Sequence, residues 1–459
     1  MSLNNILKVT TISVLVALAS PGFSTTLTDA LIAAYQTNPA LRVGRSSLRA
    51  TDEAVRQSKA VNLPTVRGNL SADRRITRSP NTGATQSNSA SLTAAIPIYT
   101  GGTGRLGVEQ ARDNVLASRQ ALIATEQNVL LNAVTAFMDV RRDQSNVEIA
   151  RNSVKVLAEE VRAANERFQV GEVTRTDVAQ ADSRLAAAQS TLQISRAALK
   201  RSISAYIAAI GSKPKNLRTP PATPKLPASA DAAEAVAIAK HPNIVQQQFL
   251  VQAAEKAVEI ARGNKRPSVS ALISAQRGTN SFLNIYQNSG SVGLDVNQTI
   301  YQGGRLNSRE RQAIAQLDQQ KANLQLTGLQ VRQNVQSLYA TWVASKASIK
   351  ARQKQVRAAQ IAFDGASEEA KLGARTTLDV LNSEQDVLQS QSDLLTAIRD
   401  EYVNAYGVLA AMGLLTVDHL KLGITSYNPD IHYKKVNGTK KFGAKRAKLF
   451  EKLKKLSGN

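Results

Sequence analysis

The sequence of 459 residues contains no cysteine and only three histidines. Without cysteine, the chain cannot form disulfides, thiolate zinc sites or iron–sulfur clusters, and it has no cysteine nucleophile. His241, His419 and His432 are too scattered along the sequence to predict an imidazole metal site. We therefore expect no metal, no cofactor and no redox chemistry.

Aromatic residues make up only 4% of the sequence, and hydrophobic residues 42%. The chain is instead rich in alanine, glutamine and serine, which is typical of long, closely packed helices rather than of a large globular core. An enzyme would need a pocket with a convergent set of acids and bases, and the sequence shows no such set. We therefore predict that the protein is not an enzyme and has no catalytic residue.

Acidic residues are also few, with 35 Asp and Glu against 58 Lys and Arg, for a net charge of +23. Residues 434–459 carry ten of the basic residues and one acid, Glu451. A basic terminus of this kind is more often a solvated appendage than a binding element. The rest of the chain has no arginine-rich helix with interleaved aromatics, so we expect no nucleic-acid partner.

Long apolar runs are absent except at the N-terminus, where Lys8 precedes an apolar stretch over 9–19 and small residues follow up to Ser24. This pattern predicts a signal peptide over residues 1–24. The run is shorter than the roughly 20 residues that a membrane-spanning helix needs. An exported chain without such a helix is expected in the periplasm, at the cell surface or in an outer-membrane β-barrel.

The sequence contains an internal repeat. The motif Tyr-x-Gly-Gly at 99–102 recurs at 301–304, and Gly-x-x-Thr-x-x-Asp-Val at 171–178 recurs at 373–380, both offset by 202 positions. A fixed offset between several motifs indicates a tandem duplication. We predict a first repeat over 25–212, a proline-rich linker over 213–229, a second repeat over 230–415, and a C-terminal segment with the basic tail over 416–459.

Each repeat is predicted to contain the same order of elements. In the first, helices are expected over 28–61, 104–168 and 175–211, and strands over 65–74 and 88–99. Apolar and polar residues alternate along the strands, which fits a barrel wall with a lipid face and a wet face. A pair of soluble hairpins is the alternative that the strands alone leave open.

The long helices carry a heptad pattern of apolar and small residues. A helix of about 65 residues is roughly 100 Å long, far more than a globular core requires, so it must project as a rod or line a tube. Small seam residues allow antiparallel helices to approach closely. The seam positions are Val147, Val154, Val161 and Phe168 in the first long helix and Val380, Ser383, Val387, Ser390 and Leu394 in the second return helix.

The element order and the two repeated motifs resemble the TolC family of outer-membrane efflux proteins over residues 28–415. The resemblance implies a mixed membrane protein: a homotrimer in which each protomer gives four strands to a 12-stranded outer-membrane β-barrel that continues into a long periplasmic α-helical coiled-coil barrel. It also places the linker in the equatorial region and the protein in the cell outer membrane, spanning into the periplasm. Independently, four strands cannot close a barrel alone, so oligomerisation is required.

The function implied by the resemblance is a passive exit duct of a tripartite efflux or type I secretion system. Its partners would be outer-membrane lipid, a periplasmic adaptor protein and an inner-membrane pump. The alternative is a secreted coiled-coil adhesin without channel activity, which does not explain a tandem duplication with hairpins between the helices.

A literal G-x-G-x-x-G occurs at 102–107, after a strand and before a helix. The preceding strand is not a continuous apolar run, and the second repeat lacks the pattern, so we do not predict a dinucleotide site. Glycine tolerates the backbone conformations needed where a strand turns into a helix. We therefore assign Gly101, Gly102, Gly303 and Gly304 to the junction between barrel and tunnel.

The resemblance places a periplasmic gate at the helical tips, where Gly171 and Gly373 form the turns. Asp379 would contribute to a threefold carboxylate ring, and Asn382 stands where a relative has a second Asp, so one ring is expected. Arg375 would tether the closed state, with Asp177 as its acidic partner beside Thr174. From the residues alone, Asp177 and Asp379 are also explained as caps at helix N-termini, and for Asp177 this explanation is as good as a link in the gate.

Overall fold

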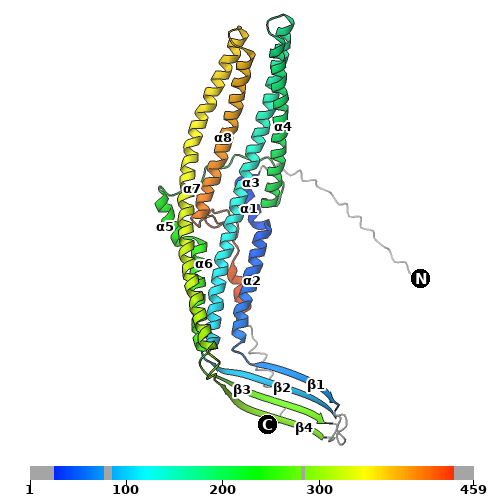
Figure 1. Cartoon of the computed structure of the whole chain (residues 1–459), viewed down its shortest axis with the longest axis vertical. Coiled ribbons are helices and arrows are strands. Elements are labelled where there is room, and N and C mark those ends of the chain that lie inside the picture. Colours follow the sequence, from blue (N-terminus) through cyan, green and yellow to red (C-terminus); the bar gives the residue numbers. More distant parts are fainter. Residues whose placement is uncertain (1–24, 77–84, 281–284, 439–459) are drawn as a thin grey trace, which may run out of the picture.

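The computed structural model describes residues 25–76, 85–280 and 285–438. Two long helical hairpins lie at one end of an elongated molecule, and a four-stranded sheet lies at the other (Figure 1). The predicted signal peptide and residues 439–459 of the basic tail lie outside the described residues.

The order helix, helix, strand, strand, long helix, helix occurs twice. The first repeat contains α1 (Leu27–Thr37), α2 (Pro39–Ala60), β1 (Thr65–Arg75), β2 (Thr85–Thr100), α3 (Thr103–Gln169) and α4 (Arg175–Ile210). The second contains α5 (Ala230–Lys240), α6 (Pro242–Gly263), β3 (Ser268–Asn280), β4 (Ile285–Asn297), α7 (Arg305–Lys371) and α8 (Thr377–Ala411). A short helix, α9 (Pro429–Asn437), follows. None of the described helices is apolar enough over a sufficient length to cross a membrane.

The single helix predicted over 28–61 is wrong, because the chain breaks between α1 and α2. Asn38 adopts an extended conformation, and its side chain accepts a hydrogen bond from the Ala40 N–H at 2.9 Å. Pro39 follows at the first position of α2, where its missing N–H costs nothing. The second repeat has the same break, with the His241 ring capping α6 before Pro242.

The four strands form one antiparallel sheet in the order β1-β2-β3-β4. Its central pair, β2 with β3, joins the two repeats from Ser87 opposite Asn280 to Thr100 opposite Ser268. The register shifts between Pro97 and Tyr99. A proline lacks the N–H that a ladder needs, which accounts for an irregularity at this point. β1 and β4 each pair on one side only.

The largest buried core lies midway along the helices, around Phe137 of α3 and Tyr206 of α4. Burial raises the pKa of the Tyr206 hydroxyl to about 12. The segment between the repeats runs along this level, since Tyr339 of α7 donates to the Pro227 carbonyl and Tyr402 of α8 to the Pro221 carbonyl, each at 2.9 Å. These bonds attach it to both helices of the second hairpin.

Helix α9 is docked on the first repeat by polar contacts. The His432 Nδ1 lies 2.8 Å from Oδ2 of Asp52, a fully buried residue of α2. Arg119 of α3 pairs with Asp430 at 2.7 Å and lies over the Tyr433 ring. The described part of the C-terminal segment is therefore integrated into the fold.

We expect deletion of residues 439–459 to leave assembly intact, and deletion from Pro429 onward to lower stability. The longer deletion removes the contacts of α9 with Asp52 and Arg119, and the hydrogen bond to the Asp52 carboxylate alone contributes about 1–3 kcal/mol. Thermal unfolding in detergent measures the difference, and His432→Ala isolates the contribution of the ring. A shorter deletion that prevented assembly would show that the tail has a structural role.

Candidate gate at the helical tips

Each hairpin ends in a short turn built around a glycine. Gly171 lies between α3 and α4 with φ at 81°, and Gly373 lies between α7 and α8 with φ at 74°. This left-handed conformation favours glycine over residues with a Cβ. Next to the glycines, Val170 and Leu372 are 72% and 85% exposed. The tips therefore present apolar side chains to their surroundings.

The return helices both begin with a capping box. In α4, the Thr174 N–H donates to Asp177 at 2.8 Å, and the Asp177 N–H donates to the Thr174 hydroxyl at 3.3 Å. In α8, Thr376 and Asp379 form the same two bonds at 3.1 and 3.2 Å. The hydrogen bonds from the threonines are the largest cause that lowers the pKa of each aspartate. Both carboxylates are thus ionised at neutral pH and held at the tips.

Arg375 finds its partner within its own hairpin. Its Nε donates to the Glu369 carboxylate at 2.8 Å, and both side chains are about half exposed. Within one protomer, Arg375 therefore contacts Glu369 and Asp177 is engaged with Thr174. The link between Arg375 and Asp177 stays a prediction for the assembled protein.

Asn382 connects the two hairpins. Its Oδ1 accepts a hydrogen bond from Arg184 of α4 at 2.9 Å. Arg184 was not predicted as a site residue, although the sequence contains a signal: no acidic residue lies three or four positions from it, where helical ion pairs form. An unpaired arginine on a helix rich in small residues is a candidate for a contact with another helix.

A second connection between the hairpins is buried. The Ser153 hydroxyl of α3 donates to the Glu384 carboxylate of α8 at 2.7 Å. Glu384 is only 6% exposed, and burial is the largest cause that raises its pKa. Beside it, a cavity of about 220 Å³ lies between α3, α4 and α8. This pair was not predicted from the sequence either.

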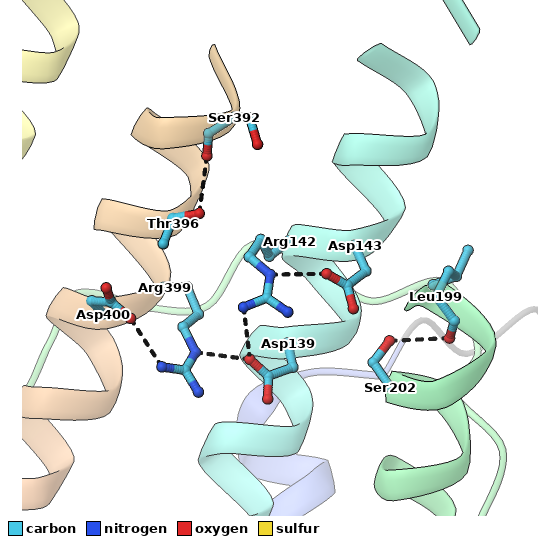
Figure 2. A network of polar contacts seen from close by, with 9 residues as sticks. All are labelled: Asp139, Arg142, Asp143, Leu199, Ser202, Ser392, Thr396, Arg399 and Asp400. Carbon is cyan, nitrogen blue, oxygen red and sulfur yellow. Dashed lines mark hydrogen bonds and ion pairs between the residues drawn. The ribbon is translucent and has the colours of Figure 1, made fainter. Parts of the chain in front are cut away.

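Farther from the tips, a network of charged groups joins α8 to α3. Figure 2 shows Arg399 of α8 between Asp139 of α3 and Asp400, at 2.8 and 2.9 Å. Arg142 extends the network, with Asp139 at 3.4 Å and Asp143 at 2.8 Å. Each side chain is at least partly shielded from water, and each charge has a partner of opposite sign.

The four junction glycines lie at the starts of the long helices. Gly101 and Gly102 have φ angles of 66° and 86°, and Gly303 and Gly304 have 55° and 79°. Gly102 and Gly304 are the N-cap residues of α3 and α7, in the left-handed conformation. The first glycine of the G-x-G-x-x-G pattern therefore marks the point where the chain changes from strand to helix.

A model of the outer membrane efflux protein family matches residues 31–212 and 235–413, most of the chain and once in each repeat. The chain belongs to the outer membrane efflux protein family. It is 36% identical over 415 residues to the outer membrane efflux protein BepC of Brucella suis, covering 90% of this chain and 91% of that protein. It is 24% identical to outer membrane protein TolC of Escherichia coli, covering 89% and 87%.

Among solved structures, the Campylobacter jejuni CmeC outer membrane channel superimposes with a TM-score of 0.74 at 16% identity, covering 91% of this chain and 90% of that one. The predicted fold class, the outer-membrane location and the function as an outer-membrane channel of efflux and secretion systems are thus confirmed. Outer membrane efflux proteins are channels rather than enzymes. Membership of this family decides against the adhesin alternative.

Proposed function

We propose that this outer membrane efflux protein is a homotrimeric, passive exit duct whose periplasmic entrance is closed at the helical tips. Cargo would reach it from an inner-membrane pump through a periplasmic adaptor, and outer-membrane lipid would surround the barrel. The observation that carries the proposal is that one protomer alone leaves two strand edges unpaired and one flank of α7 exposed.

The sheet has two free edges, because β1 and β4 each pair on one side only. A lipid bilayer offers no hydrogen bonds to such edges, so a spanning sheet must close on itself. Three copies of four strands give twelve, an even number within the range of known outer-membrane barrels. Pairing of β4 with β1 of the next protomer would close the barrel.

The helices support the same assembly. α3 and α7 are equivalent and have 67 residues each, yet α3 buries 19 of its residues and α7 only six. The difference arises because α3 packs between α2 and α6, whereas α7 packs on α6 without an extensive contact with α2 of its own chain. By repeat symmetry, α2 of a neighbouring protomer would cover the exposed flank of α7.

At the entrance, Asp379 would form the carboxylate ring, and Arg375 would link neighbouring hairpins through Asp177 in the closed trimer. The exposed Val170 and Leu372 at the tips offer apolar contacts for the adaptor. Asn382 would contribute a neutral link to Arg184 rather than a second ring of charge.

Native mass measurement in detergent and planar-bilayer recording test the proposal together. We expect three chains per particle and discrete conductance steps. A folded, stable monomer, or trimers without conductance, would contradict the duct.

A further inference from the structure

The contact between Glu384 and Ser153 lies near the tips, where the two hairpins of one protomer meet. Both side chains are buried, and they come from different repeats, α8 and α3. Glu384 has no ion-pair partner among the described residues. A buried carboxyl held by one neutral hydroxyl is more easily accommodated when it carries a proton.

The charges around Glu384 come from three helices. Arg184 of α4 favours the ionised form and Glu160 of α3 opposes it, but both effects are smaller than that of burial, so the pKa of Glu384 is raised. Arg184 is itself bonded to Asn382. On the α7 side, the nearest ion pair across to α8 joins Arg352 to Asp393, at 2.8 Å.

The adjacent cavity offers a path for proton exchange. Its lining is mixed, with apolar side chains and polar ones, among them Asn146, Gln385 and Gln389. The Asn146 Oδ1 is buried and has no hydrogen-bond partner among the described residues. A cavity of about 220 Å³ with polar groups in its wall is large enough to admit several water molecules.

The Arg399 network attaches α8 to α3 at a second point, about 22 Å farther along the helix at 1.5 Å per residue. Arginine stays protonated throughout the physiological range, so in this attachment each carboxylate faces a fixed positive charge. Of the two attachments, only the one nearer the tip joins a carboxyl to a neutral partner among the described residues.

We propose that Glu384 and Ser153 form a proton-dependent latch, which holds α8 against α3 when the carboxyl is protonated and releases the tip half of α8 when the proton is lost. The Arg399 network is the fixed point about which that half moves. The proposal rests on the tip gate described above, and it adds a control of that gate by pH.

The direction of the effect follows from where Glu384 lies in the two states. In the latched state burial raises its pKa, and in the released state water restores the ordinary value of about 4.3. The latched state is therefore fully favoured below that ordinary value and loses stability as pH rises through the raised value. Opening is expected to increase from acid to neutral pH.

The test compares the trimer with its Glu384→Gln variant in planar bilayers from about pH 4 to about pH 8. We expect the mean conductance of the unmodified trimer to rise with pH. The equilibrium constant for opening should increase by up to roughly tenfold for each unit by which the pKa of Glu384 in the latched state exceeds its pKa in the released state. Glu384→Gln keeps a side chain that can accept the Ser153 bond but cannot ionise, so its conductance should stay low and independent of pH.

Two further variants distinguish the latch from a general effect of pH. Glu148→Gln removes an exposed carboxylate of α3 that pairs with Arg151 of its own helix, and it should keep the unmodified profile. Ser153→Ala removes the hydrogen bond that lowers the Glu384 pKa, so its transition should move to higher pH. Retention of the unmodified profile in Glu384→Gln would overturn the latch.

A distance measurement tests the latch without relying on conductance. Because the chain has no cysteine, spin labels at Ala158→Cys on α3 and Gln385→Cys on α8 report the separation of the two helices directly. The separation should increase from acid to neutral pH, and the increase should vanish when Glu384→Gln is added. Trimers without conductance would overturn the duct, whereas a separation that does not change with pH would overturn the latch.

Discussion

The Gly101→Ala variant is expected to lose most of its assembled protein, whereas Gly303→Ala is expected to keep most of it. The two glycines are equivalent positions of the repeats, and both have positive φ. A side chain at either position costs about 1–2 kcal/mol in that conformation. Only at Gly101 does the added Cβ also meet backbone, because it would lie 2.4 Å from the Gly263 carbonyl oxygen.

The overlap at Gly101 would force apart the end of β2 and the end of α6, where the two repeats touch. Such a displacement adds about 1–3 kcal/mol to the conformational cost. At Gly303, no atom of the described residues other than its chain neighbours lies within 4 Å of the added Cβ. The yield of trimers in membranes and their melting temperature in detergent measure the difference. Equal, severe losses would show that a neighbouring protomer approaches Gly303 as closely as Gly263 approaches Gly101.

The Arg375→Ser variant is expected to raise the mean conductance of the channel severalfold. Arg375 is the basic residue of the second tip turn, and in the proposed closed trimer it links that tip to Asp177 of the first. Threefold symmetry repeats the lost link at each protomer, so small individual effects act on one cooperative gate. Asp379→Asn keeps an oxygen that can accept the Thr376 N–H of the capping box but removes the charge, so it should instead lower cation selectivity without raising conductance.

Two matched variants identify the partner through which Arg375 acts. Glu369→Gln removes its partner within the protomer, and if Asp177 is the partner in the closed trimer, conductance should stay low. If Glu369→Gln opens the channel as Arg375→Ser does, the link to Asp177 is wrong. Lys371→Ser, which removes a neighbouring basic residue that pairs with Glu368 on its own helix, should leave conductance unchanged. Unchanged conductance in Arg375→Ser itself would remove the tether.

The long elements could be predicted from the sequence because each carries a local pattern that spans many residues. The heptads place α3 and α7, alternation places the strands, and the repeated motifs show the duplication. The helix break before Pro39 was missed, although Asn38 followed by proline is a local stop signal and the equivalent His241 precedes Pro242. The apolar pattern continues on both sides of the break, and it predicted one continuous helix in spite of the capping residue.

The contacts between the hairpins could not be predicted in the same way. The predicted seam of α8 includes Val380 and Val387, which describes one apolar face of the helix. Glu384 lies one helical turn from both Val380 and Val387 and bonds to Ser153 of α3, and its burial depends on how the two hairpins meet. From the sequence alone, a charged residue at such a position is expected to be exposed to solvent, because only the neighbouring helix buries it.

The central pair of the sheet determines the order in which the chain can fold. β2 and β3 lie on opposite sides of the whole α3–α4 hairpin in the sequence, whereas each helical hairpin is formed by contacts between neighbouring segments. Local contacts form early and distant ones late, because long loops must close first. The helical hairpins can therefore form while the chain is still incomplete, but the strands of the first repeat must wait, unpaired on one edge, until the second repeat has been synthesised and exported.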